Sequence, residues 1–430
     1  MVSEKLITYI KDGGLDPVLT RLYGSDAVAP QRERYISLVN DYRREFGDGD
    51  ISLFSVPGRS EISGNHTDHQ KGRVIAAAID LDIIAAASPR TDGKVTVKSK
   101  GFDPDRTTCE KKLPAEGGFD KSVALVEGVC TGLLNRGYNT VGFDAVTTSN
   151  VLKGSGLSSS AAFEVMIGNI ENHFANGGRT ANAELAEISQ YAENVHFGKP
   201  CGLMDQTACA VGGFTYIDFG GDKAEIEKLS FSLTEKGYSL CITDTGGSHA
   251  DLTPDYASVP ADMKAAARVM GGEVLRPFTL SDLIANADKI RKECGDRAFL
   301  RAYHFINENA RVVTESGYLR SGDLDGFFDC VEASGRSSFM WNQNAYSPSH
   351  VTEQGVPVGL ALSEMLLAGT ERRAVYRLHG GGFAGTMQAF VPDEDVRSYK
   401  EGMEKVFGEG RCHILHIRED GAIRLSLENK

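Results

Sequence analysis

Residues Val151–Gly168 read VLKGSGLSSSAAFEVMIG, a glycine-rich turn followed by serines and then by small and apolar residues at helical spacing. Glycines let the backbone approach a bound group closely. The free N–H groups and the dipole of a helix N-terminus favour an anion, and serine hydroxyls can cap the helix, bind phosphate or ligate Mg²⁺. No Gly-Lys-Ser/Thr follows the glycines, so the stretch is not a P-loop. It predicts either a phosphate site of another kind or an ordinary capped helix.

The composition predicts a soluble, acidic, globular protein. The 430 residues are 41% hydrophobic and 24% charged, which allows a large core and two lobes. The formal net charge of −13 argues against nonspecific binding to nucleic acid. No apolar run is long enough to span a membrane, and the N-terminus lacks the features of a signal peptide. The eight cysteines include no CxxC pair, so we expect reduced cysteines and a cytoplasmic location.

Strands and helices are expected in both halves of the chain. Ile51–Val56 alternates like a strand and leads into a dense polar loop over residues 57–69, and residues 73–88 read as two buried strands. The region from Asp262 to about Leu366 is mainly helical in pattern. The regular alternation of strand and helix typical of a doubly wound fold is missing. We therefore predict an α+β protein with mixed or antiparallel sheets.

Four segments in this order carry a family resemblance: PGRSEISGNHTDHQKG from Pro57, KGSGLSSSAAFE from Lys153, PCGLMDQ from Pro200 and HGGGFAGT from His379. The first, second and fourth resemble the three motifs of the GHMP small-molecule kinases. The first also resembles the galactokinase signature G-R-x-N-[LIV]-I-G-E-H-x-D-Y, and PCGLMDQ resembles the galactokinase segment with the catalytic aspartate. Together the segments cover about residues 51–391, so the resemblance extends over most of the chain.

The resemblance implies a two-lobed GHMP kinase fold with the active site between the lobes. We assign residues 1–225 to an N-terminal lobe with the sugar loop and the serine-rich loop, and residues 226–430 to a C-terminal lobe. The implied reaction transfers the γ-phosphoryl group of ATP, with Mg²⁺, to the anomeric hydroxyl of a hexose, with galactose as the first choice. We expect neither nucleic acid nor membrane as a partner, and a monomer or weak homodimer.

The resemblance also implies the catalytic residues. Asp205 would accept the proton of the sugar hydroxyl, which is a poor nucleophile until that proton leaves. Arg59 would lie beside Asp205 and offset the negative charge that develops during transfer. The simpler interpretations are an aspartate that caps a turn and an arginine in a surface ion pair.

The residues implied for ATP lie in the serine-rich loop: Lys153, Gly154, Ser155, Gly156, Leu157, Ser158, Ser159, Ser160 and Ala161. Ser160 and Glu193 would ligate the metal, because Mg²⁺ prefers oxygen ligands and keeps waters and phosphates as well. The sequence leaves open which of the three serines contacts the metal, and Glu193 could equally be a solvated helix residue.

The residues implied for the sugar are Asn65, His66, Asp68, Gly202 and Tyr256. A carboxylate that accepts hydrogen bonds from two neighbouring hydroxyls discriminates between epimers, because a misplaced hydroxyl leaves a buried acceptor unpaired. A tyrosine at this place could also belong to the core. The run His66-x-Asp68-His69 could form a metal site, but further ligands nearby in sequence are missing.

The chain departs from the galactokinase signature at the sugar end. Asn65 replaces the family glutamate, which faces the sugar C6 hydroxyl in the galactokinase resemblance, and Glu61 replaces the family asparagine. Ser63 replaces an aliphatic residue, and His69-Gln70 replaces the tyrosine. An amide at position 65 would tolerate an anionic group near C6, and the run His-x-Asp-His-Gln resembles plant galacturonokinases. Galacturonate is therefore the alternative substrate, although asparagine can still bind a C6 hydroxyl.

An alternative of another class is a non-catalytic sensor that binds sugar and ATP and regulates a partner. Loss of Arg59, Asp205 or the serine–alanine run of residues 158–162 would have favoured a sensor, and all of these are present.

Overall fold

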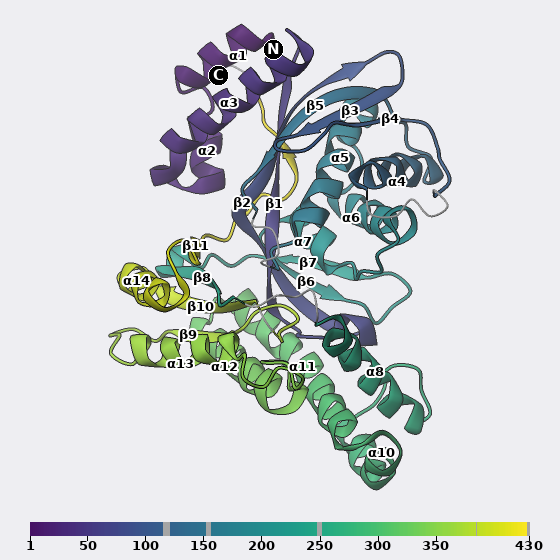
Figure 1. Ribbon diagram of the computed structural model, residues 1–430, viewed down its shortest axis with the longest axis vertical. Coiled ribbons are helices and arrows are strands. Elements are labelled where there is room, and N and C mark those ends of the chain that lie inside the picture. Colours follow the sequence, from purple (N-terminus) through teal and green to yellow (C-terminus); the bar gives the residue numbers. More distant parts are fainter. Residues whose placement is uncertain (115–120, 152–155, 247–251, 384, 428–430) are drawn as a thin grey trace.

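The computed structural model describes residues 1–114, 121–151, 156–246, 252–383 and 385–427, which form two sheets with helices around them (Figure 1). In the first sheet the strands run in the order β12-β1-β2-β5-β3-β4, with β6 also paired to β2 and β7 paired to β6. Only β3 and β5 are parallel, and the other described pairs of this sheet are antiparallel. Its strands are β1 (Ser52–Ser63), β2 (Arg73–Arg90), β3 (Lys94–Ser99), β4 (Asp105–Thr108), β5 (Gly142–Ser149), β6 (Phe214–Asp218), β7 (Glu225–Leu229) and β12 (Ile423–Arg424).

The second sheet is antiparallel and has the order β11-β8-β10-β9. Its strands are β8 (Tyr238–Asp244), β9 (Val375–Leu378), β10 (Thr386–Pro392) and β11 (Cys412–Leu415). One mixed and one antiparallel sheet, both accompanied by helices, confirm the α+β prediction. The predicted division at residues 225 and 226 falls at the start of β7, which still belongs to the first sheet. The chain end also returns there, since Arg424 of β12 pairs with Phe54 of β1.

Strands β1 and β2 are longer than the sequence indicated. Residues 73–88, expected as two strands, lie in the single strand β2, because one edge of β2 pairs with β6 at Arg73–Ala77 and with β5 at Ile83–Arg90. Strand β1 continues past Val56 to Ser63 along the other edge. The first half of the expected polar loop is therefore a strand, and this gives Arg59 a fixed direction.

The first sheet is covered on both faces, as alternate residues of β2 show. Ile84 and Ala86 pack into the cluster formed by the N-terminal helices, whereas Ile83, Ala85 and Ala87 pack into the main core on the opposite face. Figure 1 shows the two groups of helices on either side of the sheet. The N-terminal group is α1 (Ser3–Lys11), α2 (Asp16–Tyr23) and α3 (Val28–Phe46), and the opposite group is α4 (Ser122–Asn135), α5 (Ser159–Asn176), α6 (Asn182–Tyr191), the π-helix η3 (Ala192–Phe197) and α7 (Met204–Val211).

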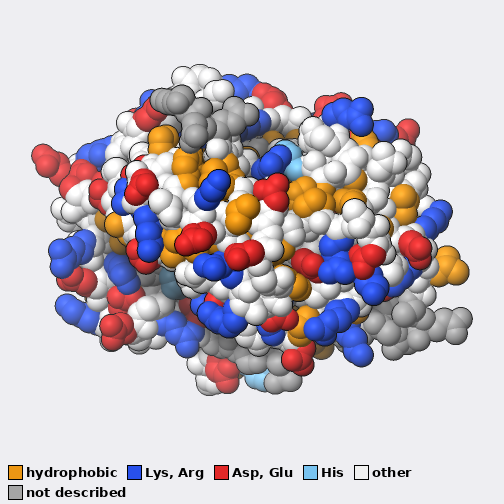
Figure 2. Space-filling view, turned by 90° about the horizontal axis from the view of Figure 1, so that it is seen from above, with side chains coloured by type: hydrophobic (Ala, Val, Ile, Leu, Met, Phe, Trp, Pro, Cys, Tyr) orange, Lys and Arg blue, Asp and Glu red, His pale blue; other side chains and the backbone are white. Residues whose placement is uncertain are grey.

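Residues 262–366 are mainly helical, as predicted, and further helical residues lie before and after them. The described α- and π-helices of the second half are α8 (Thr253–Val269), α9 (Leu280–Ala285), α10 (Ala287–Cys294), α11 (Asp296–Ser321), α12 (Leu324–Ser337), the π-helix η5 (Ser338–Asn342), α13 (Gly355–Leu367) and α14 (Val396–Phe407). None of the helices in the described ranges is apolar over a length that could cross a membrane. Figure 2 shows acidic and basic side chains interspersed over the face seen from above.

Candidate active site

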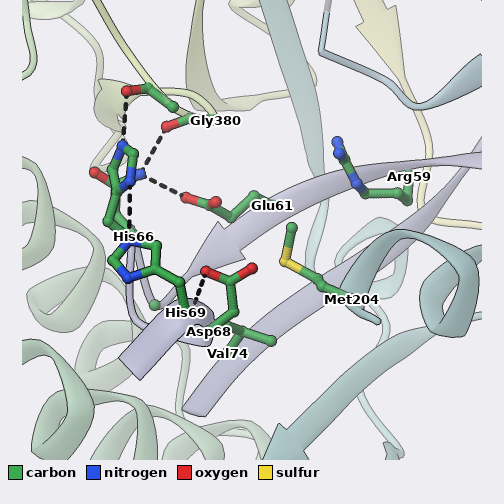
Figure 3. Close-up of a pocket in the computed structure, with 11 residues that line it drawn as sticks. Arg59, Glu61, His66, Asp68, His69, Val74, Met204 and Gly380 are labelled. Carbon is green, nitrogen blue, oxygen red and sulfur yellow. Dashed lines mark hydrogen bonds between the residues drawn. The ribbon is translucent and has the colours of Figure 1, made fainter. Parts of the chain in front are cut away.

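A cavity of about 240 Å³ lies where the end of β1, the turn that follows it and the loop after β9 meet (Figure 3). This volume is below the range of about 300–1,000 Å³ typical of drug-sized ligands, and so suits a smaller molecule. The cavity is lined by Arg59, Glu61, Gly64, Asn65, His66, Asp68, His69, Val74, Met204, Gly380 and Gly381. Segments far apart in sequence therefore converge on one polar site.

Arg59 and Asp205 form a two-pronged ion pair at this cavity. The Arg59 Nε lies 2.7 Å from Asp205 Oδ1, and Nη2 lies 2.6 Å from Oδ2. Arg59 comes from β1 and Asp205 from the first turn of α7. Burial alone would raise the pKa of Asp205, but the charge and hydrogen bonds of Arg59 hold this pKa below its usual value. The predicted proximity of the two residues is present in the structure.

The serine-rich segment approaches the same pair. The Arg59 Nη1 donates a hydrogen bond to the Gly156 carbonyl, and the Ser158 hydroxyl donates to Asp205 Oδ2. A side chain at Gly58 could not be accommodated, because its Cβ would lie 2.8 Å from the Leu157 carbonyl oxygen. Through Ser158, which precedes α5, the N-terminus of that helix lies beside the ion pair.

The structure locates most of the residues predicted for ATP. Ser158 has left-handed backbone angles and precedes α5, and Ser159 and Ser160 begin that helix. The side chains of Leu157 and Ala161 are fully buried in the core, so these two residues can offer only backbone groups to a ligand. The predicted positions Lys153, Gly154 and Ser155 lie outside the described residues.

The two predicted metal ligands lie together beside α5. The Ser160 Oγ is 3.5 Å from Glu193 Oε1. Glu193 is buried, with Lys199 Nζ 3.0 Å from Oε1 and Gln206 Nε2 2.8 Å from Oε2. A hydroxyl and a carboxylate are the oxygen donors that Mg²⁺ prefers, so these residues fit the ion if Lys199 moves away from Oε1. Lys199 and Gln206 were not among the predicted residues, although Gln206 ends the PCGLMDQ segment and Lys199 directly precedes it.

Asp68, His66 and Gly202 meet at the sugar end predicted for the site. Asp68 Oδ1 accepts a hydrogen bond from the His69 N–H at 2.8 Å, and a Cβ at Gly202 would lie 2.5 Å from Asp68 Oδ2. The His66 Nε2 lies 2.9 Å from the Gly381 carbonyl oxygen and therefore carries a proton, since a carbonyl only accepts. Burial, together with His69, lowers the pKa of His66 to about 3, so its ring is neutral at physiological pH.

Asn65 and Tyr256, the other two residues predicted for the sugar, form hydrogen bonds with other parts of the protein. Asn65 lines the cavity but is fully buried, and both the nitrogen and the oxygen of its side-chain amide form hydrogen bonds within the protein. Tyr256, from α8, is absent from the cavity lining and donates a hydrogen bond to the Gly382 carbonyl at 3.0 Å. Its ring lies edge-on to Phe383, so Tyr256 supports the glycine-rich loop.

Glu61 is a cavity residue that the sequence marked only as a departure from the family signature. It follows Arg59 by two residues in a regularly paired part of β1, so both side chains point to the same face. Arg377 Nη2 lies 3.5 Å from Glu61 Oε1. Burial raises the pKa of Glu61, and Arg377 and Asn65 oppose that rise. Recognising that β1 extends to Ser63 would have predicted this position.

The His66-x-Asp68-His69 run does not gather enough ligands for a metal. His69 Nε2 lies 3.4 Å from His66 Nδ1. Within the described ranges of the chain, no group of three or more His, Cys, Asp or Glu side chains could hold a metal ion.

Known proteins match this chain in sequence and in overall fold. Residues 40–89 match the galactokinase galactose-binding signature, and residues 124–213 match the GHMP kinases N-terminal domain. The galactokinase of Streptomyces coelicolor is 30% identical over 370 residues, which are 85% of this chain and 91% of that protein. This chain belongs to the galactokinase family. Human galactokinase, another member, is 29% identical over 398 residues, or 90% of this chain and 95% of that protein.

Solved structures share the overall fold of this chain. A crystal structure of Lactococcus lactis galactokinase complexed with galactose matches with a TM-score of 0.74 at 23% identity, covering 90% of this chain and 99% of that one. A mevalonate kinase matches more distantly, with a TM-score of 0.56 at 16% identity over 86% of this chain and 99% of that chain. The predicted GHMP kinase fold is thereby confirmed.

Proposed function

We propose that the protein is an ATP-dependent galactokinase that transfers the γ-phosphoryl group of ATP to the anomeric hydroxyl of galactose. The paired Arg59 and Asp205 carry this proposal, because they lie between the polar cavity and the N-terminus of α5. A sugar in the cavity and a phosphate at the helix would meet at this pair. The likeness to galactokinases over most of the chain supports galactose as the sugar.

In the proposed reaction, the sugar oxygen O1 forms a bond to the γ-phosphorus while the bond to the β-phosphate oxygen breaks and ADP leaves. Asp205 accepts the proton of the attacking hydroxyl. The lowered pKa of Asp205 keeps it ionised and able to accept a hydrogen bond. Phosphoryl transfer has a loose transition state that depends mainly on positioning and charge neutralisation, so a weak base is sufficient. Arg59 positions Asp205 and offsets the charge on the transferring group.

The N-terminus of α5 is the proposed ATP phosphate site, and Ser160 and Glu193 are the proposed Mg²⁺ ligands. Bound Mg²⁺ would neutralise phosphate charge. Ser158, which already donates a hydrogen bond to Asp205, would orient that carboxylate beside the phosphate. Lys199 holds Glu193 through an ion pair at 3.0 Å, and on metal binding its ammonium group could turn to a phosphate oxygen.

For the sugar, Asp68 and His66 are the proposed hydroxyl-binding groups. Asp68 Oδ2 is the oxygen that a side chain at Gly202 would displace, so the glycine keeps this acceptor accessible to a ligand. The ring of His66 is fixed by Gly381 from the other lobe. A rigid set of acceptors and donors favours one epimer over another.

Two alternatives are less consistent with the site. Galacturonate was suggested by an amide at position 65, but the acidic side chain of Glu61 lies 3.0 Å from the Asn65 amide and lines the same cavity. A non-catalytic sensor would not need a carboxylate held ionised, yet Arg59 and Ser158 both act on Asp205. Galactose phosphorylation therefore remains the function that the geometry supports best.

The direct test is ADP formation with ATP and Mg²⁺ over galactose, N-acetylgalactosamine, arabinose, galacturonate and glucose. We expect turnover to be highest with galactose. Preferred turnover of galacturonate would replace the proposed substrate. ATP binding without turnover of any sugar would favour the sensor.

A further inference from the structure

Positions 61 and 65 carry the two residue types of the family signature in exchanged places, with Glu61 where the signature has asparagine and Asn65 where it has glutamate. We propose that Glu61 binds a sugar hydroxyl other than the one phosphorylated and selects against anionic sugars, while Asn65 positions Glu61 without contacting the sugar. This inference rests on the proposed function and assigns a specificity role within the same site.

Asn65 has no hydrogen-bonding capacity left for a ligand. Its Nδ2 donates to Glu61 Oε1 at 3.0 Å and to the Gly380 carbonyl at 2.6 Å. Its Oδ1 accepts from Asn344 Nδ2 at 2.9 Å and from Ser338 Oγ at 3.2 Å. A carboxamide offers two donor hydrogens and two acceptor lone pairs, so all four are used.

The same contacts make Asn65 a bridge between the lobes. Its partners Gly380 and Asn344 belong to the C-terminal half, and the backbone carbonyl of Asn65 lies 2.9 Å from His304 Nε2 of α11. A buried side chain with every polar group paired is costly to move. Asn65 therefore fixes the direction of the Glu61 carboxylate.

Glu61, by contrast, has an oxygen directed to the cavity. Oε1 is held by Asn65 and lies 3.5 Å from the fully buried Arg377, whereas Oε2 has no hydrogen-bond partner among the described residues. The side chain lines the cavity together with Asp68, as Figure 3 shows. A carboxylate oxygen at a cavity wall can accept a hydrogen bond from a ligand, and a sugar hydroxyl would supply the donor.

The position of Glu61 also decides which end of the sugar it can contact. Arg59 and Glu61 point to one face of β1 two residues apart, and consecutive same-face residues of a strand are about 6–7 Å apart. With the reacting hydroxyl at Arg59 and Asp205, the hydroxyl at Glu61 is therefore a different one. A carboxylate at this place repels a carboxylate on the sugar.

The test measures dissociation constants by titration calorimetry, with kcat/KM in parallel, for galactose, its 2-, 3-, 4- and 6-deoxy analogues and galacturonate. The variants are Glu61→Gln and, as a matched control on exposed β7, Glu225→Gln. We expect Glu61→Gln to weaken galactose binding about 10- to 100-fold, the range for a hydrogen bond to a charged group. Wild type should bind one of the deoxy analogues more weakly than galactose by a similar factor. Glu61→Gln should bind that analogue little more weakly than it binds galactose.

Galacturonate provides a readout that simple destabilisation would not change. Its affinity relative to galactose should rise about tenfold or more in Glu61→Gln and stay unchanged in Glu225→Gln. The proposal would be overturned if the binding losses from Glu61→Gln and from removal of a hydroxyl were additive for every deoxy analogue, and if the affinity for galacturonate relative to galactose were unchanged. Asn65→Ser is measured as a third variant, and if the deoxy analogues lose their discrimination in Asn65→Ser but not in Glu61→Gln, Asn65 is the contact instead.

A misfolded variant and an inactive wild type can each be distinguished from a wrong role for Glu61. If Glu61→Gln does not fold, Glu61→Asp repeats the panel, because it retains the charge but withdraws the oxygens from the hydroxyl. If wild type binds galactose without phosphorylating it, the proposed function fails, while the binding data still decide the role of Glu61.

Discussion

Replacing Arg59 by methionine tests how the ion pair controls Asp205. In Arg59→Met the two hydrogen bonds to Asp205, of 2.6 and 2.7 Å, and the one to Gly156 are lost while most of the side-chain volume remains. Breaking a buried ion pair costs about 3–5 kcal/mol. The Asp205 side chain is 30% exposed, so water solvates part of it, and we expect a loss of stability of about 2–3 kcal/mol.

The same change should lower kcat/KM about 100- to 1,000-fold, the loss typical when one stabilising donor is removed from a transition state. It should also shift the acid limb of the profile of kcat/KM against pH to higher pH. In wild type the pKa of Asp205 lies below its usual value because of Arg59, so the carboxylate stays ionised at low pH. Without Arg59, burial raises that pKa against only the Ser158 hydrogen bond and the charge of Lys199.

The folding stability should also depend on the ionisation of Asp205. A depressed pKa in the folded state means that ionised Asp205 stabilises wild type above the pKa of the unfolded chain, and that this contribution is lost as the pH falls through the folded pKa. In Arg59→Met the orphaned carboxylate should instead destabilise the protein at neutral pH. Adding Asp205→Asn to Arg59→Met should therefore restore part of the melting temperature.

The assay combines ADP release as a function of pH with thermal melting. The matched control is Arg320→Met, because Arg320 binds Glu227 in the same two-pronged manner, at 2.8 and 2.6 Å, with both side chains nearly half exposed. We expect the control to lose at most about 1 kcal/mol and to keep its pH profile. An unchanged acid limb in Arg59→Met, or additive effects of Arg59→Met and Asp205→Asn on stability, would show that Arg59 does not control the ionisation of Asp205.

Two further predictions concern the metal and the sugar. Glu193→Gln should raise the Mg²⁺ concentration needed for half-maximal activity, because an amide binds the ion more weakly than a carboxylate; a Mg²⁺ titration checks this, and an unchanged midpoint would exclude Glu193 as a ligand. Gly202→Ala should raise the KM for galactose more than it lowers kcat, since the new Cβ would lie 2.5 Å from Asp68 Oδ2; initial rates at varied galactose check this, and an unaltered KM would contradict it.

The sequence was sufficient for the fold class and for the central ion pair, since Arg59 and Asp205 themselves occupy the expected places in their motifs. It was less informative wherever tertiary pairing decided the outcome. The polarity of residues 57–63 predicted a loop, but pairing with β2 along its whole edge extends β1 through them. Once that extension is known, the alternation of a strand places Glu61 beside Arg59.

The bonding of Asn65 could not be predicted from sequence. Its partners Gly380, Asn344 and Ser338 follow it by more than 270 residues, and asparagines and serines are common in loops. The expectation that Asn65 itself would meet the sugar came from its place in a motif. Only the packing of the second lobe shows that its amide is already fully used.

Asp205 and Arg59 are proposed to direct phosphoryl transfer from ATP to the anomeric oxygen of galactose. The most direct measurement incubates wild type and Asp205→Asn with ATP, Mg²⁺ and galactose labelled with ¹³C at C1, and follows the product by phosphorus NMR. We predict a phosphate coupled to the labelled carbon with wild type and loss of that product with Asp205→Asn. Phosphate on another carbon would exclude the anomeric oxygen as the acceptor, and equal product from Asp205→Asn would exclude Asp205 as the catalytic residue.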